Sequence, residues 1–218
     1  MPAPRKFSRE QLQVAALALV DEQGLAGLTM RNLAAELGTG AMTIYNYVDG
    51  REGLEELVTE AVMGETRWIE TAGDWPAQVL AIAEGMWRAV RAHPHAIPLI
   101  LTRRSSDIST LVPAEALLEA LARSGRSGVD LLVAFRAVSG FVTGFAQAEL
   151  TSPFAARAGE DRAAVAARVT ELPADRFPKL IEIATAAAGG DPEAEFRDGL
   201  GIVLAGLCAR GLFGGGPQ

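Results

Sequence analysis

Residues 28–48 have the sequence LTMRNLAAELGTGAMTIYNYV, a pattern typical of two short helices joined by a turn that contains glycine. In the first segment the apolar residues recur at three- and four-residue spacing, which places them on one face of a helix. They are Met30, Leu33, Ala34 and Leu37. Thr29 is a suitable N-cap, and Gly38 can adopt the positive φ that ends a helix. The pattern therefore predicts a helical hairpin with its turn near Gly38.

The second segment leaves polar and aromatic side chains on its outer face. Ala41, Ile44 and Val48 fall on the inward side, whereas the outward residues are Met42, Thr43, Asn46 and Tyr47, with Tyr45 at the edge. Asparagine can pair with adenine, and a methionine or threonine methyl group can contact thymine. Such a face suits the recognition helix of a helix-turn-helix DNA-binding unit. Many helical hairpins bind nothing, however, so the spacing alone does not decide the function.

The same stretch and the residues after it resemble the DNA-binding segment of the TetR family of bacterial repressors. The similarity rests on Leu28-Thr29, Leu33-Ala34, Leu37-Gly38, Thr43-Ile44-Tyr45, Tyr47, Arg51 and Leu54. Most members have phenylalanine at the position of Val48 and lysine at that of Arg51. The DNA contacts that we expect involve Arg31, Gly40, Ala41, Met42, Thr43, Tyr45, Asn46, Tyr47 and Arg51, with the tyrosine hydroxyls and Arg51 directed at phosphates.

The resemblance implies an all-α fold with an N-terminal three-helix domain and a C-terminal helical bundle that forms a dimeric four-helix interface. We expect a helix-turn-helix domain over residues 1–50 and an effector-binding and dimerisation domain over 51–218. A helix over about 51–72 would connect them, because the apolar periodicity after Asp49 meets no break before Gly73. Capping boxes are predicted at Ser8 with Gln11 and at Asp49 with Glu52. Further helices are predicted over 113–123, 129–150, 179–188 and 192–210.

Composition limits the classes of protein to consider. The chain has 218 residues, of which 49% are hydrophobic and 22% charged, enough for one or two well-buried domains. No secretory signal and no uninterrupted apolar run of membrane-spanning length is evident, so we expect a soluble, cytoplasmic protein without a membrane partner. The single cysteine, Cys208, excludes an internal disulfide. The net charge of −7 counts against DNA binding by the whole surface, although phosphates respond to local charge.

Two helices carry small residues at regular spacing. Gly140 and Gly144 lie in the predicted helix over 129–150, and Gly199 and Gly206 lie in the helix over 192–210. Small residues let another helix approach closely, which favours a homodimer interface built from both helices of two subunits. Close packing within one subunit is the alternative. The segments HPHAIPLILTRR, AFRAVSGFVTGFAQAEL and FRDGLGIVLAGL also resemble the C-terminal domain of the tetracycline-repressor branch.

By this resemblance, an effector cavity would be lined by Arg67, Trp68, Met86, Trp87, Ile100, Arg103, Phe135 and Gln147. The alternative is that the aromatic residues and methionine belong to the core and the arginines to the surface. Ile100 occupies the place of the metal-coordinating histidine of the tetracycline repressor, which argues against a magnesium–tetracycline chelate. We therefore expect a hydrophobic or weakly anionic effector.

The residues do not indicate catalysis or a cofactor. His93 and His95 are the only histidines, and no cluster of cysteines or carboxylates accompanies them in the sequence, so we predict no metal site. The sequence thus predicts a ligand-responsive DNA-binding transcriptional regulator, a repressor released from a palindromic double-stranded operator by a small molecule. The alternative is a helical small-molecule-binding protein or enzyme that has lost DNA recognition.

Overall fold

The computed structural model describes residues 6–70, 73–102, 107–151 and 161–210. Within these ranges all regular secondary structure is helical, which confirms the all-α prediction. The chain divides into two compact units, the first formed by Met1–Glu70 with Gly85–Glu119 and the second by Thr71–Glu84 with Ala120–Gln218. These units do not coincide with the predicted domains 1–50 and 51–218, because two helices near the middle of the chain contribute to both.

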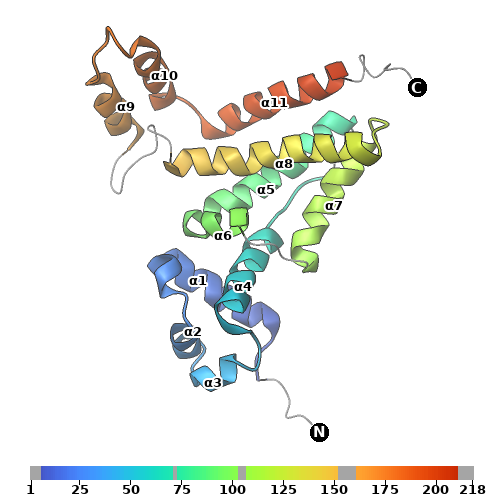
Figure 1. Ribbon diagram of the computed structural model, residues 1–218, viewed down its shortest axis with the longest axis vertical. Coiled ribbons are helices and arrows are strands. Elements are labelled where there is room, and N and C mark those ends of the chain that lie inside the picture. The colour runs from blue at the N-terminus through green and yellow to red at the C-terminus, as the bar shows by residue number, and fades with distance from the viewer. Residues whose placement is uncertain (1–5, 71–72, 103–106, 152–160, 211–218) are drawn as a thin grey trace. The chain divides into compact units, whose positions relative to one another are not determined.

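The first unit is built on a long helix that packs along a second one. Helices α1 (Arg9–Gly27), α2 (Met30–Glu36), α3 (Ala41–Ile44) and α4 (Gly50–Gly64) follow one another in the blue and cyan part of Figure 1. Helix α1 packs against α4, and α2 against α3. The core that joins them contains Leu12, Ala16, Val20, Leu33, Ile44, Leu54, Leu57 and Val58. Helix α3 therefore lies at the surface, supported by α1, α2 and α4.

The ends of these helices test the predicted caps. The Ser8 hydroxyl accepts from the Gln11 backbone N–H while the Gln11 side chain accepts from the Ser8 N–H, so the first capping box is confirmed. The second is wrong, since the Asp49 side chain makes no cap hydrogen bond. Gly50 there has φ 59° and redirects the backbone between Asp49 and the helix.

Helix α4 ends well before the predicted residue 72, so the expected continuous connector is wrong. The backbone N–H groups of Glu65 and Thr66 donate to Val62 and Met63, which tightens and closes the last turn. The Arg67 side chain then donates to the carbonyls of Gly64 (2.5 Å) and Thr66 (2.9 Å), as basic side chains do at helix C-termini. Apolar periodicity continues past Gly64 in the sequence, although the helix does not.

Four further elements follow in the middle of the chain: α5 (Trp75–Ala92), the short 3-10 helix η1 (Pro94–Ala96), α6 (Ile97–Thr102) and α7 (Ile108–Ala122). In the first unit, η1 packs against α1 and α6 against α4. Helix α7 begins upstream of the predicted start at Pro113. Asp107 explains the difference, because its carboxylate accepts from the Ser109 backbone N–H at 2.8 Å and so caps the helix earlier.

The second unit contains two pairs of helices. Helices α8 (Gly128–Thr151) and α11 (Pro192–Arg210) lie side by side, and α9 (Arg162–Thr170) and α10 (Pro178–Ala188) form a hairpin (Figure 1). The rings of Phe141 and Phe145 on α8 contact Phe196 on α11, each at a centroid distance of 5.4 Å. Starts and ends of α8, α10 and α11 agree with the predictions to within two residues.

Helix α8 is more apolar than the sequence analysis allowed. Its segment Gly128–Glu149 is long and apolar enough to cross a membrane by length and composition alone, with a mean hydropathy of 1.5. Core helices of soluble proteins pass the same test, but only 22% of this one is buried. Much of its apolar surface therefore lacks cover within the described part of this chain.

Candidate nucleic-acid interface

The candidate recognition element is a single helical turn followed by a tight turn. Gly38, at φ 60°, ends the α2 region, and Gly40 precedes α3 in an extended conformation. Helix α3 spans only Ala41–Ile44, which is shorter than predicted, and the backbone N–H of Tyr47 then donates to the Ile44 carbonyl at 2.9 Å. Ile44 and Val48 are buried as predicted. These two anchors fix which side chains face outward.

The outward face consists mainly of three residues. Met42 is 77% exposed and Tyr45 55% exposed, and Asn46 is also exposed. Thr43 is partly buried, with its hydroxyl 3.2 Å from that of Thr39. Tyr45 thus lies on the outer face rather than at its edge. Of the other predicted contact residues, Arg31 and Gly40 are exposed and Ala41 is half-buried.

Tyr47 is only partly exposed, whereas the sequence places it on the outward face. Its hydroxyl accepts a hydrogen bond from the Phe7 backbone N–H at 3.0 Å, and its ring lies 6.2 Å from the Phe7 ring. The side chain therefore connects the end of the recognition element to the start of α1. A buried tyrosine usually has a hydrogen-bond partner for its hydroxyl, but the sequence does not reveal that partner.

Arg51, for which we predict a phosphate contact, makes hydrogen bonds within the chain. Its guanidinium donates to the carbonyls of Leu28 (2.6 Å) and Leu25 (2.9 Å) and to the Glu55 carboxylate (2.6 Å). Arg9, the basic residue at the start of α1, is paired with Glu60 at 2.7 Å. Of the basic residues between 6 and 51, Lys6 and Arg31 are the other two, and both are exposed.

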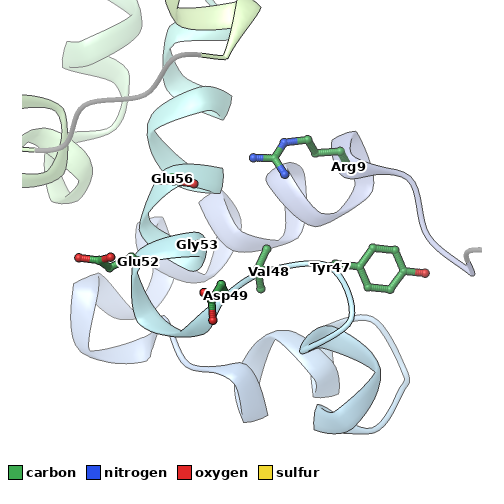
Figure 2. Close-up of a pocket in the computed structure, with 7 residues that line it drawn as sticks. All are labelled: Arg9, Tyr47, Val48, Asp49, Glu52, Gly53 and Glu56. Carbon is green, nitrogen blue, oxygen red and sulfur yellow. The ribbon is translucent and has the colours of Figure 1, made fainter.

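A small pocket of about 210 Å³ lies beside this element, between the first turn of α1, the segment 47–49 and the start of α4. Figure 2 shows its lining residues, which are Arg9, Tyr47, Val48, Asp49, Glu52, Gly53 and Glu56. Three of the lining side chains are carboxylates and one is the Arg9 guanidinium, so the negative charges outnumber the positive one and disfavour a phosphate.

The residues predicted to line an effector cavity have varied environments. In the first unit Trp87 is fully buried, Met86 is 8% exposed, Trp68 and Ile100 are half-buried, and Arg67 caps α4. In the second unit Phe135 is half-buried and Gln147 is exposed. Arg103 lies outside the described residues. None of them lines the pocket beside α3.

Both histidines hydrogen-bond to the chain itself. His93 Nδ1 lies 2.8 Å from an Asp21 carboxylate oxygen, and its Nε2 lies 2.9 Å from Glu65. Burial opposes the charged ring, but the hydrogen bonds that the ring donates to both carboxylates outweigh it and raise the pKa of His93. His95 Nδ1 lies 3.2 Å from the carbonyls of Val20 and Asp21. Among the described residues no group of three or more potential ligands could hold a metal ion.

A short exposed helix on a three-helix support, preceded by a glycine turn, defines the first unit as a helix-turn-helix DNA-binding domain. The family model of bacterial regulatory proteins of the tetR family matches residues 12–58. The model of the tetracyclin repressor-like C-terminal domain matches residues 69–210. The chain belongs to the TetR family of transcriptional regulators.

Similar proteins and solved structures support this family assignment. An HTH-type transcriptional regulator of Saccharopolyspora erythraea is 32% identical over 93% of this chain and 85% of its own length. The HTH-type transcriptional repressor DrrR1 of Streptomyces coeruleorubidus is 31% identical over 88% of this chain and 74% of its own. The crystal structure of Streptomyces coelicolor ActR in complex with actinorhodin has a TM-score of 0.76 and 29% identity, covering 94% of this chain and 96% of that one.

Proposed function

We propose that this regulator is a homodimeric repressor that binds a palindromic operator and leaves it when a small hydrophobic or weakly anionic molecule binds. The observation that carries the proposal is the exposed trio Met42, Tyr45 and Asn46 on the recognition element of a TetR-family chain. Two such elements, held about 34 Å apart by a dimer, would meet successive major grooves on one side of a duplex.

The second unit supports the homodimer. Helix α8 exposes a stripe of small and apolar residues at helical spacing, namely Val129, Val133, Ala137, Gly140, Gly144 and Ala148. Helix α11 exposes Gly201, Ile202, Ala205, Gly206 and Ala209. We call these two stripes the dimer face. A Cβ atom added at Gly140, Gly144 or Gly206 would meet nothing within 4 Å, so this surface has room for a partner helix. Gly199 is different, because the Phe141 ring of the same chain already fills the space beside it.

The effector class is supported by Ile100 and by a structural relative. Ile100 supplies no metal-coordinating nitrogen, so we do not expect a metal chelate. ActR was crystallised with actinorhodin, which supports an organic ligand for a chain of this fold. To release DNA, the effector must prefer the non-binding arrangement, typically by about 1–3 kcal/mol. Tight binding without this preference would not change the operator affinity.

A second candidate function is a helical ligand-binding protein that no longer binds DNA. The net charge of −7 and the engagement of Arg9 and Arg51 with other protein groups favour it. Non-specific affinity for DNA should consequently be modest, and specific binding would depend on a few well-placed contacts in two copies.

Gel-shift and anisotropy titrations against the duplex upstream of the protein's own coding sequence separate the two candidates. The repressor should bind this duplex with an affinity that falls steeply between about 50 and 200 mM salt. Tyr45→Ala and Asn46→Ala should each abolish binding and leave the dimer intact in sedimentation. A matched control is Ile69→Ala, since Ile69 is 82% exposed and lies outside the recognition element. Unchanged binding by both Tyr45→Ala and Asn46→Ala would refute the assigned face.

A further inference from the structure

The corner between α1 and α2 is held by a side chain from α4. We propose that Arg51 is a positioning residue for DNA recognition, which fixes this corner and does not contact phosphate. The inference rests on the proposed function, because the corner matters for DNA binding only if α3 binds the operator.

All three nitrogens of the Arg51 guanidinium are engaged within the chain. Nη1 donates to the Leu28 carbonyl at 2.6 Å, Nη2 to the Leu25 carbonyl at 2.9 Å and Nε to Glu55 Oε1 at 2.6 Å. The Glu55 side chain is only 9% exposed, so the carboxylate has a fixed place in α4. Planar guanidinium can satisfy three acceptors in one plane, and arginine loses little freedom per hydrogen bond in doing so.

The corner is a short connection whose backbone carbonyls need hydrogen-bond partners. Gly24, at φ 67°, interrupts α1, and only Leu28 and Thr29 separate the end of α1 from the start of α2. Carbonyl groups at the end of a helix lack intrahelical partners and need others. Arg51 supplies partners for two of them, and the Asn32 side chain donates to the Gly27 carbonyl at 2.8 Å. Asn32 and Arg51 therefore add hydrogen bonds to the apolar packing of α2 on α1 and α4 that sets the direction in which α2 leaves α1.

A displacement of this corner would also displace the recognition element α3. Helix α2 packs against α3, and the two are joined only by the segment 37–40. Since Leu28 is fully buried, its carbonyl cannot turn to water without disturbing the core. Loss of the Arg51 hydrogen bonds should consequently change the orientation of α3 or broaden its range of positions, and base contacts tolerate little misplacement.

Lysine at this position would not perform the same task. Its ammonium group is a compact point charge on a flexible stem and cannot reproduce the planar fork. A phosphate contact, by contrast, needs mainly the positive charge, which lysine keeps. Arg51→Lys therefore distinguishes the two roles, and Arg51→Ala shows the effect of removing both the fork and the charge.

The experiment measures two properties of the full-length protein and of its Arg51→Lys, Arg51→Ala and Arg31→Ala variants. The first is affinity for the duplex upstream of its own gene, by anisotropy at several salt concentrations. The second is the melting temperature without DNA. Arg31 serves as the comparison because it is exposed on α2. A substitution in a homodimer removes one phosphate contact from each subunit, which reduces the slope of log affinity against log salt by about two.

We expect both Arg51 variants to bind roughly tenfold or more weakly at every salt concentration, with an unchanged slope. Their melting temperatures should fall by about 4 °C or more. Arg31→Ala should lower the slope and keep the melting temperature. The proposal is overturned if Arg51→Lys binds and melts like the unaltered protein, or if Arg51→Ala lowers the slope by about two without changing the melting temperature. If Arg51→Ala does not fold, Arg51→Lys alone decides.

The two proposals fail in different ways. If the unaltered protein shows no salt-dependent binding to the duplex, the proposed repressor function is wrong, and the positioning role in DNA recognition falls with it. The melting temperatures would then still show whether Arg51 holds the corner. If the unaltered protein binds normally and Arg51→Lys also binds normally, the repressor function stands and only the role of Arg51 is refuted.

Discussion

At the scale of single residues, the Glu60 carboxylate is the most deeply buried partner of the ion pairs described in the first unit. Its side chain is 2% exposed and accepts from Arg9 Nε at 2.8 Å, Arg9 Nη2 at 2.7 Å and Gln13 Nε2 at 2.9 Å, all from α1. Hydrogen bonds to this carboxylate raise the pKa of Arg9 above its usual range. A single side chain on α4 thus fixes the first two turns of α1.

Glu60→Ala should lower the free energy of unfolding by about 2–3 kcal/mol, because it removes charge-assisted hydrogen bonds and leaves Gln13 and Arg9 to find other acceptors. Urea denaturation followed by circular dichroism measures the change. Glu36→Gln, an exposed carboxylate on α2, is the control and should stay within about 0.5 kcal/mol. Equal stability of the two variants would show that the contact contributes nothing.

The second prediction for a single residue concerns Gly85, where there is no space for a side chain. A Cβ atom at this position of α5 would lie 2.2 Å from the Arg67 carbonyl oxygen, which is backbone and cannot rotate away. Gly85→Ala should therefore destabilise the protein by about 1–3 kcal/mol, as overpacking does. Gly64→Ala is the matched control, since its nearest neighbour would be Ser109 Cβ at an ordinary 3.6 Å. Thermal melting of both variants tests this difference.

The hydrogen bonds of long polar side chains are what the sequence did not reveal. Ile44 and Val48 were predicted to be buried from periodicity alone, because burial of apolar groups follows helical spacing. Tyr47, Arg51 and Arg67 are predicted to bind DNA or effector, and the structure shows that each also hydrogen-bonds a backbone group of the chain. Which carbonyls or N–H groups lack partners depends on where helices end and meet in space, and sequence patterns do not specify this.

At the scale of elements, the existence and order of the helices followed from the sequence better than their ends. The hairpin of residues 28–48 and the helices α8, α10 and α11 were predicted because glycine, proline and capping residues lie at their boundaries. Helices α4 and α7 were misplaced at one end each. Their boundaries depend on Arg67, which caps α4 from beyond its end, and on Asp107, which caps α7 ahead of Pro113.

The contact of the α5–η1 junction with α1 and α4 gives a prediction about pH. His93 joins Asp21 of α1 to Glu65 at the end of α4, and its pKa in the folded protein is raised. The unfolded value is about 6.5, so this stabilisation is fully present below about pH 6.5. It is lost as the pH rises through the higher folded-state pKa.

His93→Gln should therefore remove this part of the pH dependence. The unaltered protein should lose on the order of 1 kcal/mol of stability as the pH rises above about 6.5, and the variant should show a flatter profile. Urea denaturation at a series of pH values measures both. Glu22→Gln, an exposed carboxylate next to Asp21, should keep the original profile. The same slope in His93→Gln and the unaltered protein would exclude the ion pairs as its source.

At the scale of the whole molecule, the proposed dimer face is an apolar surface that one chain leaves open. Ile202 is 76% exposed on α11, and Val129 is equally exposed on α8. Exposed apolar patches of this kind are uncommon on monomeric proteins and mark association sites. Burial of the face in an isologous pair would also bring the two helix-turn-helix units under one symmetry axis, as a palindromic operator requires.

Ile202→Glu should consequently convert the dimer to a monomer and, with it, reduce operator binding, because a monomer contacts only one half-site. Val14→Glu, at a 64% exposed position on α1, should remain dimeric.

Gly140→Ala distinguishes more sharply between a dimer that uses this face and one that does not. In a single chain the added methyl group meets nothing within 4 Å and should stabilise α8 by about 0.5–1 kcal/mol. In a dimer packed on this face it should weaken association, so sedimentation that shows a tighter or unchanged dimer for Gly140→Ala would place the interface elsewhere.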